Sequence, residues 1–312
     1  MRNQHGNITG RSPDGNALES GFAGVQTAAH RDSWIRASQY KSGHTANFVP
    51  FLSGVSAEGI AFSRDGQWIT YSSFPEGTLW RSKVDGSERR QLTFPPLRVF
   101  LPRWSPDNAH IAFSADVPDV ARNVYVISSE GGTPQRIFPS EQSQSDVDWS
   151  VDGNSLVFSS LFVPGAPIYT FDLQSKRLST LADSNGLFAP RLSPDGKYVA
   201  ATTTDGPSKL MLFDVPAQKW RTLVDSKVGN PAWSRDGKYV YFQDWQKEDG
   251  RERILRVRLT DGKVEAVADV EKNGRLTTGT FVDWFGITPD GSPLLARDIS
   301  SQELYALDVR WP

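Results

Sequence analysis

A short turn motif recurs six times along the chain: Ser or Thr, any residue, Asp, then Gly or Asn. It reads FSRDG at 62–66 and WSPDN at 104–108. The six aspartates are Asp65, Asp107, Asp152, Asp195, Asp236 and Asp290. Their successive spacings are 42, 45, 43, 41 and 54 residues. Four of these match the period of a four-stranded propeller blade, about 40–45 residues. The repeat therefore predicts a β-propeller.

The motif suits a tight turn between antiparallel strands. Ser or Thr can bond the local backbone, Asp tolerates the third position, and Gly takes the φ > 0 position that closes the hairpin. Asn108 replaces Gly in one copy, and Asn is the next best residue at φ > 0. An alternating strand follows each turn, as in AHIAFSA at 109–115, and two more strands follow in most copies. Each full repeat supplies four strands, and we find no long helical pattern.

The number of blades depends on how the ring closes. The last copy supplies a third strand, ELYALDVRWP at 303–312. Because an exposed sheet edge is a liability, we expect TANFVPFL at 45–52 to form the outer strand of the last blade. This predicts an all-β, six-bladed propeller of four-stranded antiparallel blades over 45–312, closed by an N-terminal strand. Seven blades is the alternative, since RSPDG at 11–15 resembles another copy of the turn.

The first 44 residues are poor in apolar runs. We expect 1–44 to be a degenerate or disordered segment, the remnant of a partial blade. The chain is expected to be a fragment of a longer parent.

Composition narrows the possible partners and compartments. The chain has 34 Lys and Arg residues and 36 Asp and Glu residues, so its net charge is −2. This charge does not favour binding to nucleic acid or to a membrane surface. With no cysteine, the sequence excludes disulfides and thiol catalysis. No apolar run approaches 18 residues, and the N-terminus has no apolar region typical of a signal peptide. We expect a cytoplasmic monomer by default.

The repeats also carry a family resemblance. Asp-Gly turns at this period, each followed by a hairpin such as GTLWRSKVDGSERRQLT at 77–93, resemble the TolB-type repeat, a relative of the WD repeat. The segments 76–96 and 288–308 resemble propeller segments of large bacterial proteins, in which a winged-helix or Ser/Thr kinase domain precedes the propeller. The resemblance implies a sensory or scaffolding module that binds protein. A membrane-spanning parent would place it in the periplasm.

Most enzyme signatures are missing from the sequence. It contains no G-x-S-x-G, Walker loop, G-x-G-x-x-G or H-E-x-x-H motif. His110 is the single histidine of the repeat region, and its repeat position favours packing between blades. Trp104, Trp149 and Trp233 share another repeat position, which we assign to interblade packing. An enzyme is therefore less expected than a binding module, although the sequence leaves both open.

The segments just before the Asp turns are expected to line the central channel, where propellers collect ligands. They carry a mixed-charge and aromatic set that we predict to form the partner-binding mouth. Its members are Glu58, Phe100, Arg103, Asp146, Asp148, Phe188, Arg191, Asn230, Asp283 and Trp284. The ligand is expected to be a protein or peptide of unknown identity, bound without a cofactor. Solvated or mutually paired charges around a water-filled hole are the structural alternative.

A metal site is the sharper alternative. Oxygen ligands from four repeats, Glu58, Asp146, Asn230 and Asp283, would make a set of the kind that Ca²⁺ prefers. Such a site would belong to a metal-dependent hydrolase or lyase with its chemistry in the channel. The sequence thus leaves two function classes: a non-enzymatic scaffold that acts through one channel mouth, and a propeller enzyme.

Overall fold

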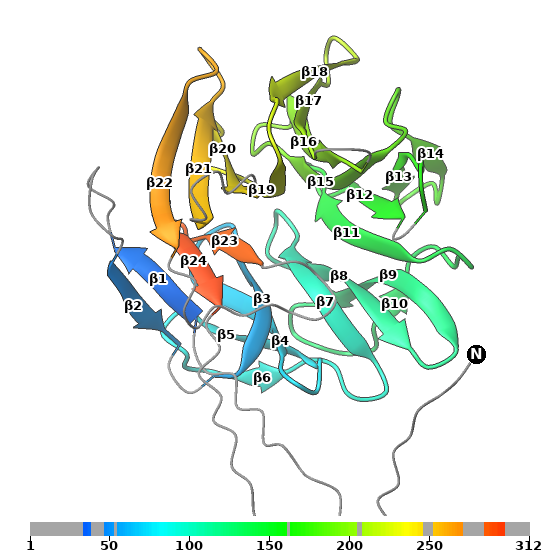
Figure 1. Ribbon diagram of the computed structural model, residues 1–312. Helices are drawn as coiled ribbons and strands as arrows, with labels where there is room; N and C mark the ends of the chain where they lie inside the picture. Colours follow the sequence, from blue (N-terminus) through cyan, green and yellow to red (C-terminus); the bar gives the residue numbers. More distant parts are fainter. Residues whose placement is uncertain are drawn as a thin grey trace, which may run out of the picture. The chain divides into compact units, whose positions relative to one another are not determined.

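The computed structural model describes residues 34–38, 47–52, 55–160, 163–204, 208–245, 252–270 and 284–296. These residues form 24 β-strands in antiparallel sheets with a propeller arrangement (Figure 1). All the strands belong to one compact unit, His30–Ser300. Among the described residues, no helix is long and apolar enough to cross a membrane.

Five blades each contain four strands that are consecutive in the chain. Blade 1 is β3 (Ala57–Phe62), β4 (Trp68–Ser73), β5 (Leu79–Lys83) and β6 (Arg90–Gln91). Blade 2 is β7 (Arg98–Trp104), β8 (His110–Val117), β9 (Val120–Ser128) and β10 (Gln135–Arg136). Blade 3 is β11 (Gln144–Trp149), β12 (Ser155–Ser160), β13 (Ile168–Asp172) and β14 (Leu178–Thr180). Blade 4 is β15 (Leu187–Leu192), β16 (Tyr198–Thr203), β17 (Leu210–Asp214) and β18 (Lys219–Val224). Blade 5 is β19 (Val228–Trp233), β20 (Tyr239–Asp244), β21 (Glu252–Arg258) and β22 (Val264–Val270).

One further sheet joins strands from distant parts of the chain, and we call it the split sheet. Its strands are β1 (Trp34–Ser38), β2 (Asn47–Phe51), β23 (Phe285–Ile287) and β24 (Pro293–Ala296). Their order is β2-β1-β24-β23, so β2 is the outer strand. Because β1 pairs directly with β24, it takes the place that we expected 303–312 to fill, and that prediction is wrong. Residues 303–312 themselves lie outside the described residues.

The blades built from consecutive strands number five, whereas the sequence analysis expected six and, as the alternative, seven. The difference arises because the split sheet uses strands that are remote in sequence, and repeat counting cannot detect such pairings. β1 comes from residues 1–44, which the sequence analysis set apart from the propeller. The predicted boundary at residue 44 stays a prediction.

The repeated turn has the predicted role. In blade 1 the Ser63 hydroxyl donates to Asp65 Oδ1 at 2.5 Å, and the Gln67 N–H donates to the same oxygen at 2.9 Å. Gly66 closes the turn at φ +75°. The same hydroxyl–carboxylate bond recurs in Ser105–Asp107, Ser150–Asp152, Ser193–Asp195, Ser234–Asp236 and Thr288–Asp290. These aspartates stabilise turns, as the sequence indicated.

The repeated tryptophans connect neighbouring blades. Trp149 on blade 3 donates its Nε1–H to the carbonyl of Arg103 on blade 2 at 3.1 Å. Trp233 on blade 5 makes the equivalent bond to the carbonyl of Arg191 on blade 4 at 2.9 Å. Trp104 does the same with Ala61, so interblade packing is confirmed at all three positions. Each tryptophan both fills the interblade core and fixes the innermost strand of the preceding blade.

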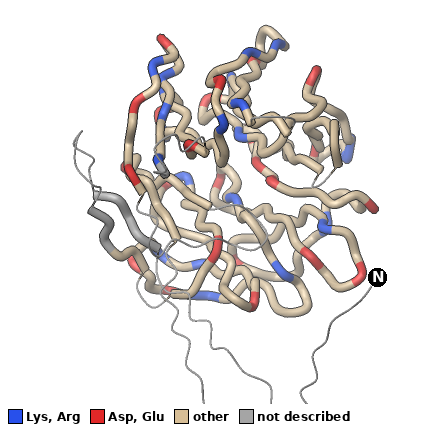
Figure 2. The backbone as a smooth tube through the Cα atoms, viewed as in Figure 1, with Lys and Arg blue, Asp and Glu red and all other residues tan. Residues whose placement is uncertain are grey.

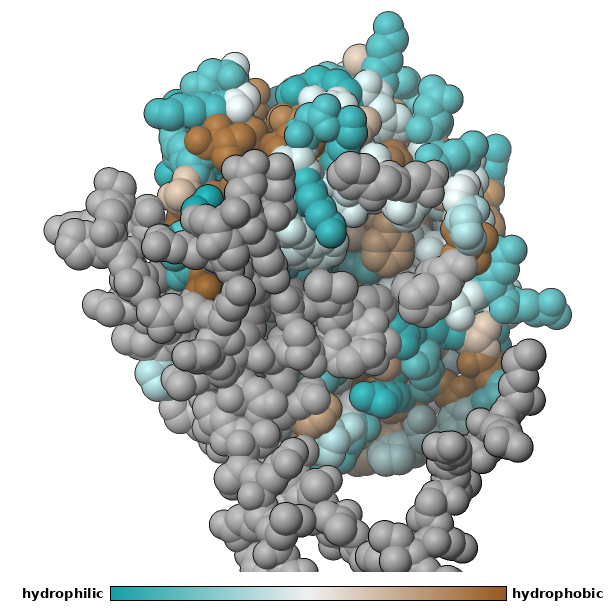
Figure 3. Space-filling view, in the orientation of Figure 1, coloured by the Kyte–Doolittle hydropathy of each residue, from teal (hydrophilic) through white to brown (hydrophobic). Residues whose placement is uncertain are grey.

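The described part of the outer surface carries few exposed large hydrophobic side chains. Lys and Arg are interspersed with Asp and Glu over the described strands and turns (Figure 2). The described surface in Figure 3 is mostly hydrophilic, with small separate hydrophobic areas. The exposed large hydrophobic side chains of the described residues are far apart in the sequence: Phe94 lies between β6 and β7, Val120 begins β9 and Val264 begins β22.

Candidate functional site

A β-bulge interrupts the innermost strand of every blade. The register between the first two strands shifts at the same place in blades 1 to 5. The residue at each bulge has a positive φ, in the left-handed region of backbone conformation. These residues are Gly59 (59°), Leu101 (48°), Asp146 (54°), Ala189 (55°) and Asn230 (50°). Since a bulge redirects side chains, these five positions control what points into the space between the blades.

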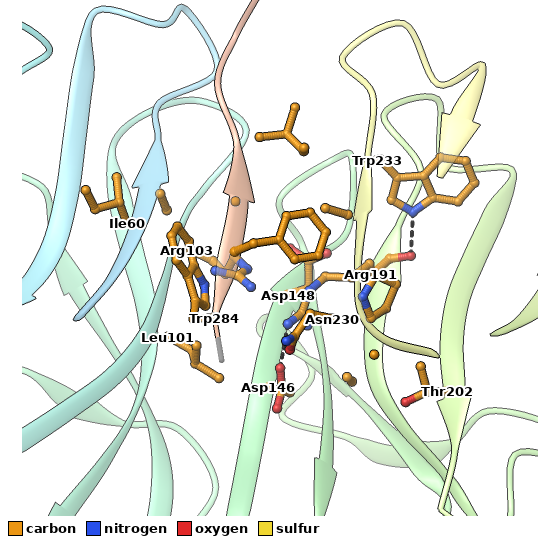
Figure 4. Close-up of a pocket in the computed structure, with 18 of the residues that line it drawn as sticks. Ile60, Leu101, Arg103, Asp146, Asp148, Arg191, Thr202, Asn230, Trp233 and Trp284 are labelled. Atoms are coloured by element: carbon orange, nitrogen blue, oxygen red, sulfur yellow. Dashed lines mark hydrogen bonds and ion pairs between the residues drawn. The ribbon is translucent and has the colours of Figure 1, made fainter. Parts of the chain in front are cut away.

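The innermost strands enclose a cavity of about 360 Å³. One part of its lining is polar and comes from blades 2 to 5: Arg103, Asp146, Asp148, Arg191 and Asn230. The other part is apolar and includes Ile60, Leu101, Phe188, Trp245, Trp284 and Phe285. Figure 4 shows Trp284 beside Arg103, and Asp146 close to Arg191. A cavity of this size and mixed lining is typical of a ligand site.

Arg191 and Asp146 form a buried ion pair. Arg191 Nη2 lies 2.5 Å from Asp146 Oδ1, and the two side chains are 11% and 5% exposed (Figure 4). Arg191 also donates from Nη1 to the Pro190 carbonyl at 2.8 Å. The bulge of blade 3 turns the carboxylate toward blade 4, so this pair links two blades across the cavity wall. Burial makes such a pair costly to break, because either partner alone would be an uncompensated charge.

Asp148 accepts hydrogen bonds from the backbone. Its Oδ2 accepts the Leu192 N–H from blade 4 at 3.0 Å, and its Oδ1 accepts the Trp149 N–H at 3.0 Å. Leu192 occupies the strand position at which three other blades have a tryptophan, and leucine has no indole N–H to donate to the preceding blade. The bond from the Leu192 backbone N–H to Asp148 connects the two blades instead. Both oxygens of this carboxylate are thus engaged within the described structure.

Arg103 occupies the same strand position in blade 2 as Arg191 in blade 4. Its Nη1 donates to the Pro102 carbonyl at 3.0 Å, as Arg191 does to Pro190. No carboxylate of the described residues lies within 4.0 Å of its guanidinium. Burial, and after it the positive charge of Arg191, lower the pKa of Arg103 to about 10, whereas the negative charges of Asp148 and Asp146 act in the opposite direction. The guanidinium still carries its charge at neutral pH.

Two indole rings form the apolar wall by lying against glycines. A Cβ on Gly286 would lie 2.5 Å from the Trp284 ring, and one on Gly229 would lie only 2.0 Å from the Trp245 ring. Glycine is needed at both positions because the rings rest directly on the backbone. Trp245 Nε1 is buried and has no hydrogen-bond partner among the described residues. Trp245 therefore brings an unused donor to the cavity lining.

The structure brings seven of the ten predicted site residues to this cavity: Arg103, Asp146, Asp148, Phe188, Arg191, Asn230 and Trp284. Glu58 and Phe100 line a separate, smaller pocket, which Trp284 also reaches. Phe100 is buried, and the Arg122 guanidinium lies 3.8 Å from its ring centre. Asp283 lies outside the described residues.

Sequence reasoning missed Trp245. It follows the second strand of its blade, whereas the prediction considered only the segments before the Asp turns. The signal that could have found it is Gly229, a small residue at a strand position where other blades carry Glu58, Phe100 and Phe188. Small residues in strand interiors often mark a close approach by another group.

Three of the four oxygen ligands proposed for a cation lie in the described structure, and the fourth, Asp283, lies outside it, so the cation site stays a prediction. Asp146 is paired with Arg191, and the Asn230 amide donates to Gln243 Oε1. Glu58 lines the smaller pocket. Within the described residues there is no group of three or more His, Asp or Glu side chains arranged to hold a metal.

Two curated proteins of similar sequence come from bacteria. The chain is 30% identical to the uncharacterized peptidase YuxL of Bacillus subtilis over 166 residues, which are 53% of this chain and 24% of that protein. It is 27% identical to the uncharacterized protein Atu1656 of Agrobacterium fabrum over 247 residues, 75% of this chain and 82% of that protein. The chain thus spans about a quarter of the first relative's length. No protein-family model matches it.

Solved structures with a similar fold include two described as TolB. The putative TolB from Agrobacterium tumefaciens has a TM-score of 0.66 at 23% identity, with 86% of this chain and 98% of that chain covered. TolB from Acinetobacter baumannii has a TM-score of 0.61 at 19% identity, covering 77% and 64%. A propeller in a nidogen/laminin complex has a TM-score of 0.58 at 14% identity, covering 76% and 92%. The chain therefore has a TolB-like propeller fold, as its repeats indicated.

Proposed function

We propose that this chain is a non-enzymatic module that binds a protein or peptide in the cavity between its innermost strands. The observation that carries the proposal is the amphipathic lining, with charged and amide groups on one part and indole and phenyl rings on another. Peptides present this same combination, since each residue pairs polar backbone groups with a side chain that is often apolar. The described outer surface offers no comparable apolar area.

The fold supports this proposal at the level of analogy. A structure of similar fold was solved as a nidogen/laminin complex, and TolB propellers share the architecture. Fold alone does not fix function, because propellers host many activities. We propose that the chain acts as a monomer. The cytoplasmic location expected by default, or a periplasmic one in a membrane-anchored parent, stays a prediction.

We further propose that the split sheet serves as a sixth blade that closes the ring. Two contacts support this: β23 lies against β19 of blade 5, and it lies against β3 of blade 1. Closure by strands from both parts of the chain would leave no inner sheet edge exposed between blades 5 and 1. Removal of residues 1–52 tests it, since an open ring should lose cooperative thermal unfolding.

Selection from a random peptide library displayed on phage tests the binding function. We expect enriched peptide families that bind the wild-type chain and fail to bind an Ala232→Trp variant, in which a large ring fills the cavity. The matched control is Ala217→Trp on an exposed turn of blade 4, which should bind normally. Absence of enrichment, or equal binding by the folded Ala232→Trp variant, would contradict the proposal.

The alternative function is a propeller enzyme with a divalent cation in the channel. The alignment with part of a protein named as a peptidase supports the enzyme alternative. Calorimetric titration with Ca²⁺ at millimolar concentration separates the two functions. A binding module should give no saturable heat, whereas an enzyme of this kind should give a stoichiometric signal that Asp146→Asn abolishes.

A further inference from the structure

We propose that the cavity is a carboxylate-binding subsite, with Arg103 as the cation that recognises the carboxylate. The ligand carries this carboxylate beside an aromatic or other apolar group, which packs on the indole wall. The inference rests on the proposed function and specifies its ligand: an acidic side chain or a free C-terminus of the bound peptide. A free aromatic acid shares the same chemistry, and the experiment below distinguishes the two sources.

The internal repeat shows what Arg103 lacks. In blade 4, Arg191 receives its carboxylate from the bulge residue of the preceding blade, Asp146. The preceding blade for Arg103 is blade 1, and its bulge residue is Gly59. A Cβ on Gly59 would lie 3.7 Å from the backbone nitrogen of Leu101 and from Pro102 Cδ, so this bulge faces blade 2 just as Asp146 faces blade 4. The chain thus repeats the arginine and omits its carboxylate.

The other described charges of the cavity are engaged elsewhere and make no ion pair with Arg103, and Asp148 and Asp146 favour its charged form only from a longer distance. Asp146 is held by Arg191, and both oxygens of Asp148 accept backbone N–H groups. The two arginines repel each other, which contributes to the lowered pKa of Arg103. A guanidinium in a confined space without a direct counterion is costly. An incoming carboxylate reduces this cost and gains charge-assisted hydrogen bonds from the guanidinium.

The rest of the lining suits an acid with an apolar body. Trp284, Phe188 and Trp245 offer ring faces and edges to an apolar group. Trp245 Nε1 is a second donor without an acceptor among the described residues, and its ring is fixed against Gly229. The cavity volume of about 360 Å³ exceeds the space needed by one aromatic side chain with its carboxylate.

A matched pair of probes tests the subsite: N-acetyl-L-tryptophan, which is an acid, and N-acetyl-L-tryptophanamide, which is neutral. Saturation-transfer NMR and calorimetry on the whole chain should show that the acid binds about tenfold to a hundredfold more tightly than the amide. Arg103→Gln should abolish this preference and leave the affinity for the amide unchanged. Arg256→Gln is the control, because Arg256 pairs with Glu265 outside the cavity lining.

A gain-of-charge variant gives an independent readout. Gly59→Asp should place a carboxylate opposite Arg103, as Asp146 lies opposite Arg191, and should exclude the acid. Gly59→Asn has nearly the same shape, tolerates the positive φ, and should leave acid binding largely intact. Three results would overturn the subsite. They are equal binding of acid and amide, no binding of either probe at a concentration of about 10 mM, and a preference for the acid that survives Arg103→Gln.

The outcomes separate this inference from the proposed function. Peptides selected on phage that lack any enrichment for Asp, Glu or a free C-terminus would keep the binding module and reject the subsite. Acid binding through Arg103 with no selected peptide would keep the subsite, assign it to a free aromatic acid, and reject the peptide-binding function. Selected peptides rich in acidic residues that lose binding in Arg103→Gln would support both.

Discussion

Blades 2 and 4 place an arginine at the same position of their innermost strands, and the two arginines have different partners. Arg191 is paired with Asp146, whereas Arg103 has no carboxylate within 4.0 Å among the described residues. Strand register, the proline before the arginine and the bond to that proline's carbonyl are the same in both blades. The difference lies in the preceding blade, where one bulge carries Asp146 and the other Gly59. The pairing of these two arginines therefore differs with the bulge residue one repeat earlier.

The largest effect should come from removing each arginine in turn. Arg191→Met leaves Asp146 buried without its partner, so we expect the free energy of unfolding to fall by about 3–5 kcal/mol. Arg103→Met leaves no carboxylate without a direct partner, and its effect should be near zero or stabilising. Urea denaturation followed by circular dichroism measures both.

A double variant provides the control for that comparison. Leu101 occupies the bulge position of blade 2, so leucine is compatible with this backbone. Arg191→Met combined with Asp146→Leu should recover most of the lost stability, because replacing both charges by apolar groups is often neutral. Equal destabilisation by Arg191→Met and Arg103→Met would refute the idea that their environments differ.

A smaller and symmetric effect is expected at the tryptophans behind the two arginines. Trp149→Phe removes the bond to the Arg103 carbonyl, and Trp233→Phe removes the bond to the Arg191 carbonyl. Each change should cost about 1 kcal/mol, since the ring stays and one hydrogen bond is lost. Thermal unfolding measures both variants. If the two variants lost clearly unequal amounts of stability, the backbones at Arg103 and Arg191 would differ as well as their side chains.

The smallest effect concerns the turn aspartates of the same blades. The Ser105 hydroxyl lowers the pKa of Asp107, and the Ser193 hydroxyl lowers the pKa of Asp195. A carboxyl whose pKa is lower in the folded state stabilises the fold at pH values above its unfolded pKa, about 3.9. That contribution disappears as the pH falls through the folded-state value. Stability should therefore decrease below about pH 4.

Carbon-detected NMR titration of the aspartate carboxyls checks this directly. Both Asp107 and Asp195 should titrate below the ordinary aspartate range, and by similar amounts, because their turns are alike. Ser105→Ala should return the Asp107 pKa toward its ordinary value without affecting Asp195. An unchanged Asp107 pKa in that variant would assign the shift to the Ala109 N–H instead.

Much of the fold could be predicted because its signals are local. A Ser-x-Asp-Gly turn depends on neighbouring residues, so the hydroxyl–carboxylate bond of Ser63 and Asp65 follows from four letters. The third strand of the last sheet was predicted wrongly because β1 and β24 pair across more than 250 residues. No local pattern records such a pairing.

The sequence alone determined the repeat, its turns, the interblade role of Trp104, Trp149 and Trp233, and seven of the residues that line the cavity. These features follow from short-range backbone chemistry and from a period that aligns equivalent positions in space. The tertiary structure alone decided which charges meet. Asp146 pairs with Arg191, whereas Gly59 supplies no carboxylate to Arg103, because bulges turn one blade's side chains toward the next. Charge pairing depends on distances of a few ångströms between repeats, and only the packed blades set those distances.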